Sequence, residues 1–553
     1  MIVAALLLLF AAQNVVEMRQ ESCTSDELIK LTAGYTYLLK GDFRLNTLHP
    51  PLLKLFSALP LLVLHPKIDF SDPSWNRPIN QWKFSAHFLY SNNADQILFW
   101  GRLPVILLTT ALGYFIFRWA QQLYGNFPGI FALALFCFSP TFIAHSHWVT
   151  LDAGVAALLT ISLYLLWRFA RSGKKLILLW SALAMAAALG SKYLAFAMLP
   201  GYALLLGAIY QFDFLSSGSP SGAPTRKEKE TAPRRRTRKD SDAESSRSID
   251  PEGIPSRFVQ RLNGPKIITL LVLVVVATVG AVSLLAYFGF PRFSNYFIGL
   301  AQIKWYRRPT FPFYLHGTFV DGGAWYFFTV TFLVKATAPF LILIFLRLVM
   351  FFWTLKLEWR DSIFLILPST LYFALVSVFA NPIGVRYLLP VFSLLMIFSS
   401  GLISQFAKKK IALSVLWILL GWHITSSLVA FPNHLSYFNE FVGGPSHGTD
   451  WLDDSNVDWG QELKTLKEVL DKRGIQAVTL ISFSPYDNPE YYSIRCIRPP
   501  QEEWPGLFEH PHPGTYVISA HWLARAKGLG YDWKLRYPVI ADVGNSMFVF
   551  QIP

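Results

Sequence analysis

The sequence contains few charged residues for its length. They make up 15% of the 553 residues, whereas a soluble protein carries about 25%. Three cysteines are too few for a disulfide scaffold, and no polar low-complexity composition dominates the chain, so disulfide-rich and disordered proteins are excluded. Walker, strand-linked GxGxxG, GxSxG and CxxC motifs are also missing, which leaves nucleotide-driven chemistry and covalent serine or cysteine catalysis without support.

Apolar residues are abundant at 53%, and several long stretches carry no charge. A helix needs about 20 predominantly apolar residues to cross a bilayer. The first apolar run has the length of a signal-peptide core, but it lacks a basic start and a cleavage signature, so we interpret it as an anchor. Hydropathy and charged flanks together predict eleven membrane-spanning helices, at about 2–16, 97–117, 127–145, 151–167, 176–191, 193–212, 267–289, 333–353, 362–380, 387–407 and 411–431.

Basic residues gather in alternate loops between these spans. The positive-inside rule places such loops in the cytoplasm. The segment 215–265, rich in Ser, Pro and Arg, falls on the same side, and we interpret it as a disordered linker rather than a nucleic-acid-binding segment. Segments 17–96 and 433–553 are then predicted to face outward. The basic loop residues are Arg118, Arg168, Arg171, Lys174, Lys175, Lys356, Arg360 and Lys408 to Lys410.

The segment after the last predicted span is polar enough to form a small domain. Gly460–Lys472 has the apolar spacing of an amphipathic helix that ends before Gly474. The predicted fold is therefore a polytopic α-helical membrane protein over residues 1–432, with a C-terminal extracytoplasmic α/β domain over residues 433–553. The strands of this domain are predicted at Ala477–Phe483, Thr515–Ala520 and Met547–Ile552.

Candidate catalytic carboxylates occur at the start of a predicted helix in the first outer segment. Thr24 and Glu27 have the spacing of a capping box, which explains both residues without catalysis. An Asp in the first turn also lies at the positive end of the helix, which keeps it ionised and able to accept a proton. The two interpretations are compatible, so Asp26 and Glu27 are candidate catalytic residues.

His49 and Lys54 flank a double proline at the start of an apolar segment of the same outer region. A histidine and a lysine at a bilayer surface can hold a lipid phosphate. The alternative for Lys54 is that its side chain only reaches out of the apolar layer toward water.

His145 and His147 lie in the turn that leads to Asp152. A His-x-His pair with a nearby Asp suggests a metal site, but the spacing is unspecific and polar residues that cap helices are the favoured explanation, while the metal requirement stays open.

Ionisable residues at the ends of predicted spans need a partner or water and are functional hypotheses for that reason. Asp152, Lys192, Lys335 and Arg386 all meet this criterion. The planar guanidinium of Arg386 suits a phosphate. A structural ion pair of Arg386 with Asp152 or Asp26 is the alternative.

Taken in order, these segments resemble the GT-C glycosyltransferases, specifically the glycosyltransferase family 39 group that includes protein O-mannosyltransferases. They are also similar to the aminoarabinose transferases of lipid A. The motifs that carry the resemblance span most of the chain. They are Asp26-Glu27, Ala33 to Tyr35, Gly41 to Asn46, His49 to Leu52, His145 to Asp152, Phe332 to Lys335, Arg386 to Pro390 and Asp454 to Gln461, which makes Asp458 a further candidate.

This resemblance implies an integral membrane enzyme that transfers a sugar from a polyprenyl-phosphate carrier to an acceptor hydroxyl, with inversion. Asp26 matches the acidic residue thought to act as base, and Asp152 matches the acidic residue of the second outer loop. His49 and Arg386 match basic positions near the donor phosphate. Lys30 stands where relatives carry His, which argues against a metal in this loop.

The implied partners are the lipid-linked sugar, a protein, lipid or glycan acceptor, and the bilayer, with no nucleic acid. No cofactor is implied beyond an open question about a divalent metal. The implied location is a bacterial inner membrane, with the active site outside. A transporter or lipid flippase, or a non-catalytic envelope scaffold, would be the competing interpretations. Polar residues at outer helix ends, rather than at paired broken helices near the midplane, favour the transferase.

Overall fold

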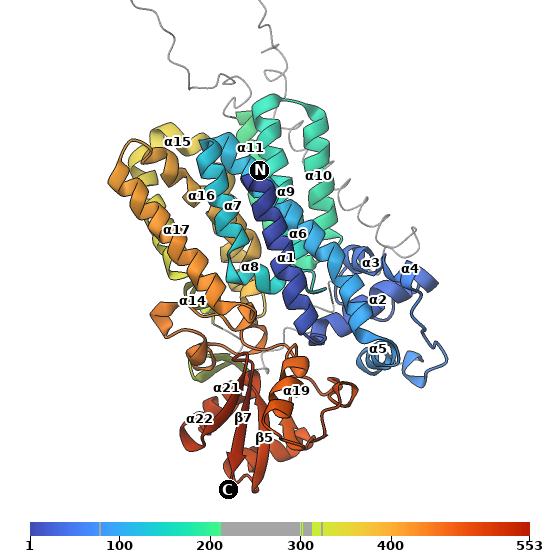
Figure 1. Ribbon diagram of the computed structural model, residues 1–553. Coiled ribbons are helices and arrows are strands. Elements are labelled where there is room, and N and C mark those ends of the chain that lie inside the picture. Colours follow the sequence, from blue (N-terminus) through green and yellow to red (C-terminus); the bar gives the residue numbers. More distant parts are fainter. Residues whose placement is uncertain (77–78, 212–298, 300, 302–311, 322–323) are drawn as a thin grey trace, which may run out of the picture.

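The computed structural model describes residues 1–76, 79–211, 299, 301, 312–321 and 324–553 (Figure 1). The predicted linker 215–265 and the predicted span 267–289 lie outside these residues. The helices are α1 Ile2–Gln20, α2 Ser25–Lys40, α3 Leu52–Ala58, α4 Leu61–Leu64, α5 Gln81–Tyr90, α6 Ala94–Tyr124, α7 Asn126–Cys137, α8 Pro140–His145, α9 Asp152–Ser172, α10 Lys175–Leu189, α11 Leu199–Gln211, α14 Phe327–Lys335, α15 Ala338–Phe379, α16 Leu389–Gln405, α17 Lys410–Ala430, α18 Gly448–Trp451, α19 Leu463–Lys472, α20 Trp504–Glu509, α21 Ala520–Gly528 and α22 Trp533–Arg536.

Apolar helices form a bundle in the upper part of Figure 1, where α1, α6, α7, α9, α16 and α17 lie along one another. Within the described residues, six helices are long and apolar enough to cross a membrane, or seven if the bent pair Phe327–Lys335 and Ala338–Trp353 forms one span. Shorter apolar helices occur at Asn126–Cys137, Lys175–Leu189 and Tyr193–Ile209. The chain is thus a multi-pass helical membrane protein, as predicted.

Several predicted spans differ in detail from the helices of the structure. The span 127–145 is divided into α7 and α8, because Pro140 cannot continue the first helix and instead begins the second. The span 193–212 begins with a 3₁₀ helix, η2 (Tyr193–Met198), before α11. Lys356 and Arg360 both lie within α15, and its two apolar parts, Ala338–Trp353 and Trp359–Phe379, form separate candidate spans that agree with the predicted spans 333–353 and 362–380. Both ends of α15 lie near Asn456, which contacts Lys335 and the Val385 N–H.

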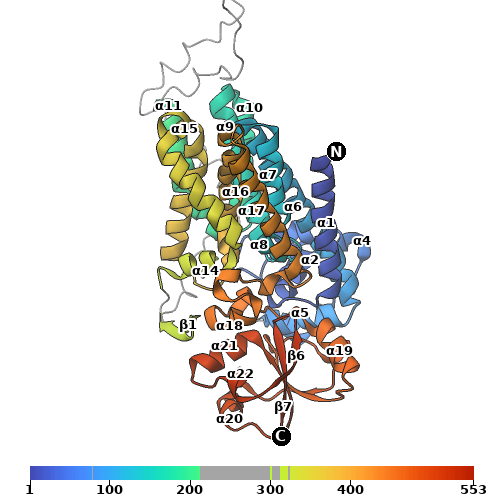
Figure 2. The same cartoon turned by 60° about the vertical axis from the view of Figure 1, so that its left-hand side comes forward.

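The outer helices α2 to α5 lie beside one end of the bundle, as Figure 2 shows for α2 and α5. The predicted capping box of α2 is present: the Glu27 N–H donates to Thr24 Oγ1 at 3.4 Å, and the Thr24 N–H donates to Glu27 Oε2 at 3.1 Å. The helix ends at Gly41, whose φ of 60° is the left-handed conformation that glycine adopts at little cost. These local signals fix Asp26 in the first turn.

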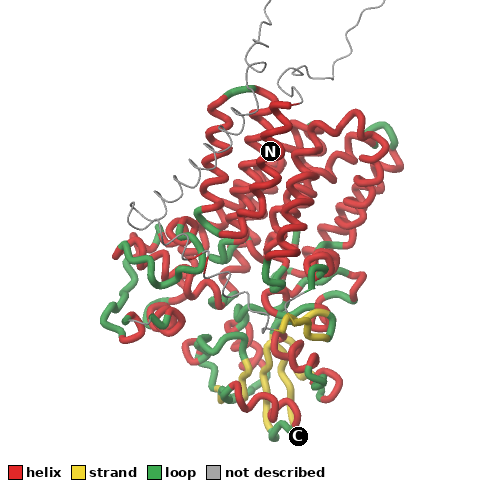
Figure 3. Tube along the Cα trace, turned by 180° about the vertical axis from the view of Figure 1, so that it is seen from behind, coloured by secondary structure: helices red, strands yellow, loops and turns green. Residues whose placement is uncertain are grey.

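A mixed five-stranded sheet lies at the same end of the molecule as the outer helices (Figures 1 and 3). Its order is β4-β3-β5-β7-β6; β3 pairs in parallel with β4 and β5, and β7 pairs antiparallel with β5 and β6. The three strands predicted from sequence correspond to β3, β5 and β7. The bounds are β3 Val478–Ile481, β4 Cys496–Ile497, β5 Gly514–Ser519, β6 Val539–Val543 and β7 Met547–Ile552, and a separate hairpin pairs β1 Pro312–Leu315 with β2 Thr318–Asp321.

Candidate active site at the end of the bundle

Titratable side chains from five separate segments meet where the outer helices contact the bundle. The segments are the first turns of α2, the loop before α3, the start of α9, the residue before η2, and the 3₁₀ helix η6 (Val385–Leu388) that precedes α16. The residues that they contribute are Asp26 and Lys30, His49, Asp152, Lys192, and Arg386.

Asp26 presents a partly exposed carboxylate, with 32% of its side chain accessible. Lys30 donates to it at 2.5 Å and also donates to the Thr150 carbonyl at 3.0 Å, which joins α2 to the turn before α9. Burial opposes ionisation, but the charges of Lys30 and Arg386 outweigh it and hold the pKa of Asp26 below its ordinary value. The carboxylate is therefore ionised at neutral pH and accessible enough to accept a proton.

Asp152 and Arg386 form the buried part of the site, at 4% and 5% exposure. Lys192 donates to Asp152 Oδ1 at 2.5 Å, whereas Arg386 Nε lies 3.7 Å from Asp152 Oδ2, too far for a hydrogen bond. Within the described part of the chain, Nε and Nη1 of Arg386 have no hydrogen-bond partner. A buried guanidinium with unused donors is equipped to bind an anionic group.

The C-terminal segment holds Arg386 in place. Its guanidinium carbon lies 4.0 Å from the centroid of the Trp459 ring, and Nη1 lies 3.9 Å from Asp454 Oδ1. A Cβ on Gly384 would lie 2.6 Å from Ser455 Oγ and 3.1 Å from Arg386 Nη1, so only glycine leaves room for this arrangement. Arg386 is thus oriented by contacts to its face and edge that do not use its Nε or Nη1 in a hydrogen bond.

His49 contributes a neutral imidazole to the site. Burial and the charges of Lys192, Lys30, Lys54 and Arg386 lower the pKa of His49 well below its ordinary value. Its Nδ1 is buried and has no partner among the described residues. The contact of His49 with a donor phosphate stays a prediction, and a neutral ring would make it by hydrogen bonding without a positive charge.

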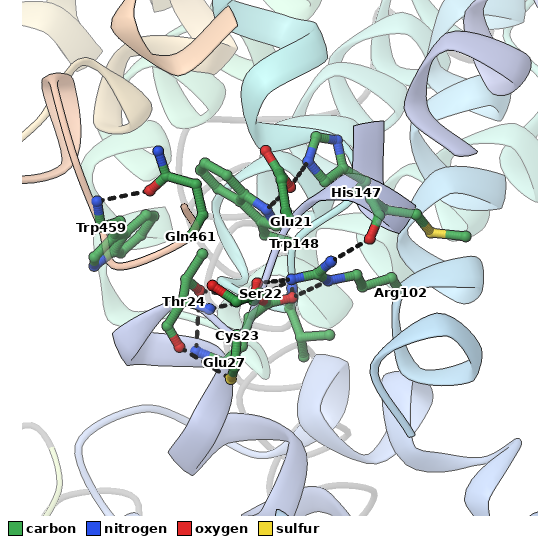
Figure 4. A network of polar contacts seen from close by, with 12 residues as sticks. Glu21, Ser22, Cys23, Thr24, Glu27, Arg102, His147, Trp148, Trp459 and Gln461 are labelled. Carbon is green, nitrogen blue, oxygen red and sulfur yellow. Dashed lines mark hydrogen bonds and ion pairs between the residues drawn. The ribbon is translucent and has the colours of Figure 1, made fainter. Parts of the chain in front are cut away.

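Glu27, predicted as a catalytic candidate beside Asp26, is engaged in an ion pair with no exposed surface (Figure 4). Arg102 donates to Glu27 Oε1 at 2.9 Å and to Oε2 at 2.7 Å, and the Val149 N–H donates to Oε1 at 3.0 Å. We therefore assign Glu27 a structural role. Arg102 was absent from the sequence-based candidates, although its position as a charge inside the predicted span 97–117 is the signal that identifies it.

Lys54 and Lys335, predicted to contact phosphate, instead donate to backbone carbonyls. Lys54 Nζ donates to Asn46 O at 2.7 Å and to His49 O at 2.8 Å. Lys335 Nζ donates to Leu435 O at 2.7 Å and to Asn456 O at 2.8 Å. Both ammonium groups connect chain segments that no local sequence pattern joins, so we assign them to the scaffold of the site.

The two histidines of the His-x-His motif have different surroundings. His145 is buried beside the rings of Trp148 and Trp459, and neither of its ring nitrogens has a partner among the described residues. His147 lies 2.7 Å from Glu21 Oε2, and these two residues with Glu17 form the one group of three potential metal ligands found in the described chain. The motif therefore does not act as a chelating pair.

Asp458, the last predicted candidate, is an internal residue of the C-terminal segment. It accepts hydrogen bonds from the Gly460 N–H at 2.9 Å and from the Ser519 hydroxyl. Burial raises the pKa of Asp458 to about 6. These contacts join the Asp454 to Gln461 motif to the sheet rather than to the cationic site.

Residues without a role assigned from sequence complete the site. Lys192 Nζ lies 4.4 Å from the centroid of the ring of Tyr387, the residue that follows Arg386 in the chain. Asp454 has a φ of 53°, an unusual conformation for an aspartate, and faces Arg386. Tyr387, Asp454 and Trp459 all lie in motifs that carried the family resemblance, which was the only signal for them.

Comparisons with known proteins give one family match and two similar solved structures. Residues 92–212, which include Asp152 and Lys192, match the model of a family described as dolichyl-phosphate-mannose-protein mannosyltransferase. ArnT from Cupriavidus metallidurans bound to undecaprenyl phosphate is 13% identical, covers 99% of this chain and 97% of its own, and has a TM-score of 0.45. The apo form of ArnT is also 13% identical, with 99% and 96% covered and a TM-score of 0.47. No curated protein sequence matches. The match over residues 92–212 confirms the resemblance of this chain to the GT-C membrane glycosyltransferases, which its motifs predict.

Proposed function

We propose that this chain is a membrane glycosyltransferase that moves a sugar from a polyprenyl-phosphate carrier to an acceptor hydroxyl, with inversion at the anomeric carbon. The observation that carries the proposal is the arrangement of Lys30, Lys192 and Arg386 around the carboxylates of Asp26 and Asp152. The Asp454 carboxylate also faces Arg386, with Oδ1 3.9 Å from Nη1. A polyprenyl-phosphate sugar is a phosphodiester with one negative charge, and the unused N–H donors of Arg386 can bind it.

The cationic residues are suited to stabilise the phosphate leaving group. As the glycosidic bond breaks, negative charge grows on the phosphate, and fixed donors in a water-poor site stabilise that charge effectively. Nε and Nη1 of Arg386 and Nδ1 of the neutral His49 ring have no hydrogen-bond partner among the described residues, so they are available to the phosphate. No general acid is then needed, because a phosphate that is neutralised by cations leaves readily.

Asp26 is suited to activate the acceptor. A neutral hydroxyl is a poor nucleophile, and a carboxylate that takes its proton raises its reactivity. Asp26 is the more exposed of the two carboxylates, whereas Asp152 is held between Lys192 and Arg386. We assign Asp26 the role of base and Asp152 the role of positioning the two cations that bind the phosphate.

We place the site on the outer side of a bacterial inner membrane. The basic ends of α9, α10, α16 and α17 lie at the end of the bundle opposite the sheet (Figure 1), which supports a cytoplasmic location for that end. A lipid carrier explains why the cationic site lies at the interface between the bundle and the outer helices.

The test uses the purified full-length chain in lipid nanodiscs with undecaprenyl-phosphate mannose, undecaprenyl-phosphate glucose and undecaprenyl-phosphate aminoarabinose as donors. Acceptors are supplied as an extract of envelope lipids and proteins, and free undecaprenyl phosphate is measured by mass spectrometry. We expect release of the free carrier with at least one donor, lost in the Asp26→Asn variant. Movement of an intact lipid-linked sugar across proteoliposomes without release of the carrier would instead establish a flippase.

The acceptor and the sugar can be identified together in cells. Envelope glycans, glycolipids and glycoproteins from strains with and without this chain are compared by mass spectrometry. We expect one sugar modification to disappear with the chain and to return with the wild-type gene but not with Asp26→Asn. Identical profiles in all strains would contradict a role in glycosyl transfer.

A further inference from the structure

A second cluster of titratable residues lies at the end of α1, separate in its contacts from the residues assigned to sugar transfer. It contains Glu17 of α1, Glu21 directly after α1, and His147 of the turn before α9. One ligand atom from each of the three lies within 4.8 Å of the others. Glu17 is 1% exposed, Glu21 8% and His147 0%. Buried carboxylates require a partner of opposite charge or a metal ion.

The ring of His147 is oriented as in a metal site. The Asn14 side-chain amide donates to the Phe10 carbonyl at 2.8 Å, so its oxygen is free to accept the N–H of His147 Nδ1, 3.1 Å away. With the proton on Nδ1, the lone pair of Nε2 points toward Glu21 Oε2, 2.7 Å away. A proton on Nε2 makes this contact an ion pair with Glu21, and a metal ion bound by both groups would take the place of that proton. Metal-bound histidines are characteristically fixed through the other ring nitrogen in this way.

The two carboxylates are also supported by neighbouring residues. The Trp148 indole donates to Glu21 Oε2 at 2.6 Å (Figure 4). His434 Nδ1 contacts Glu17 Oε1, and His434 Nε2 donates to the Ser427 carbonyl at 2.9 Å. The other oxygen of Glu17, Oε2, is buried and has no hydrogen-bond partner within the described residues. Each of the three residues thus has an outer partner, and the cluster retains an unused buried oxygen.

We propose that Glu17, Glu21 and His147 bind one divalent metal ion, for which Zn²⁺ is the best match. Two carboxylate oxygens and one imidazole nitrogen form a donor set typical of zinc, and their two negative charges balance the ion. Selection of Zn²⁺ over Mg²⁺ or Ca²⁺ rests on the imidazole, since those ions prefer oxygen ligands alone.

The position of this metal site assigns it a structural role. It joins the end of α1 to the turn before α9 and, through His434, to the segment after α17. Arg102 donates to the Met18 and Ser22 carbonyls, both at 2.8 Å, while it also holds Glu27. The ion therefore stabilises the junction from which α2 begins, and hence the position of Asp26, without contact to the reacting groups.

The experiment measures the metal content of the purified full-length chain by mass spectrometry after dialysis against buffer with trace Zn²⁺. We expect one Zn²⁺ per wild-type chain and loss of most of it in His147→Ala and Glu21→Gln. His447→Ala is the matched control, because His447 is 59% exposed, pairs with Asp450 and lies outside the cluster. Wild-type protein without metal, or equal metal content in all variants, would refute the site.

A stability measurement protects the test against variants that do not fold. Glu21→Gln keeps the size of the side chain, and gel filtration shows whether it remains monodisperse. We expect a chelator to lower the Tm of the wild type and of His447→Ala, with little effect on Glu21→Gln. An unchanged wild-type Tm would overturn the structural role. Neither readout uses a sugar donor, so the outcome is independent of the proposed transferase activity.

Discussion

Asp26 and Glu27 are adjacent carboxylates whose substitution should have opposite consequences. They point about 100° apart on α2, and the structure gives them different surroundings. Asp26 is one third exposed and pairs with Lys30, while Glu27 has no exposure and pairs with Arg102. Each is changed to the amide of the same size, which removes the charge and little volume.

The expected magnitudes follow from exposure. For Asp26→Asn, the Asp26 side chain is partly exposed and the buried Lys30 keeps its hydrogen bond to the Thr150 carbonyl, so the cost in stability is about 1 kcal/mol, less than for Glu27→Gln. Turnover falls about a hundredfold or more if Asp26 is the base. For Glu27→Gln, the Arg102 guanidinium remains buried without a countercharge, which costs about 3–5 kcal/mol. The Tm of the Glu27→Gln variant therefore falls. The turnover of its folded molecules changes far less than that of Asp26→Asn.

The assay combines thermal unfolding in detergent with transfer from a polyprenyl-phosphate sugar, normalised to folded protein. The reasoning fails if Asp26→Asn retains a near-normal transfer rate, because Asp152, whose side chain is 2% exposed and held between Lys192 and Arg386, cannot replace it as the base. It also fails if Glu27→Gln unfolds at the wild-type temperature, since a buried unpaired guanidinium would then carry no penalty.

The remaining predictions concern the phosphate contact, the scaffold and pH. Arg386→Ala should raise the KM for the donor about tenfold to a hundredfold, because one or two hydrogen bonds to a charged group are lost. Arg386→Lys should recover only part of the affinity, because lysine lacks the planar guanidinium. An unchanged donor KM would make Arg386 a structural residue. Lys54→Met should lower the Tm, since each backbone carbonyl left without its hydrogen bond costs about 1–3 kcal/mol. The KM for the donor, measured on folded protein, should not change. A wild-type Tm would contradict the scaffold role. Burial raises the pKa of Asp453 and of Asp487 to about 7, against about 3.9 in an unfolded chain. The folded chain therefore keeps protons that the unfolded chain releases, and this stability declines as pH rises from about 4 to about 7. Tm measured at about pH 5 and about pH 8 should differ less in an Asp453→Asn, Asp487→Asn double variant than in the wild type, and an equal difference would refute the assignment.

Elements with local signals were predictable from the sequence. The capping box and Gly41 define α2 without any information from the rest of the chain, and both ends agree with the structure. β7 also agrees, because a short and nearly continuous apolar run bounded by turn residues is typical of a buried strand. In contrast, β4 has only two residues and β6 contains a register irregularity, so neither produces a recognisable pattern.

The roles of individual charges were less predictable, because each depends on a partner far away in the chain. Arg102 lies 75 residues from Glu27, and Lys335 is 121 residues from Asn456, whose carbonyl it binds. Lys335 and Lys192 are both lysines at the end of a predicted span. Lys335 nevertheless binds backbone carbonyls, whereas Lys192 binds the Asp152 carboxylate. The sequence left open whether Arg386 binds phosphate or forms an ion pair with Asp152. The structure has an ion-pair contact at 3.7 Å, but this distance is too long for a hydrogen bond and leaves guanidinium donors unused.

The contacts of Arg386 show why the C-terminal segment belongs to the site and is more than an appended module. Asn456 accepts from the Val385 N–H at 2.9 Å through its side chain and from Lys335 through its carbonyl, so one residue fixes both η6 and the end of α14. Trp459 covers the guanidinium face, which removes water from the charge and strengthens its interaction with an anion. A bundle without this segment would keep Asp152 and Arg386 but lose the contacts that orient Arg386 toward Asp152. Arg386 carries the only described guanidinium of the site with unused donors. Sugar transfer by such a site therefore depends on both parts of the chain together.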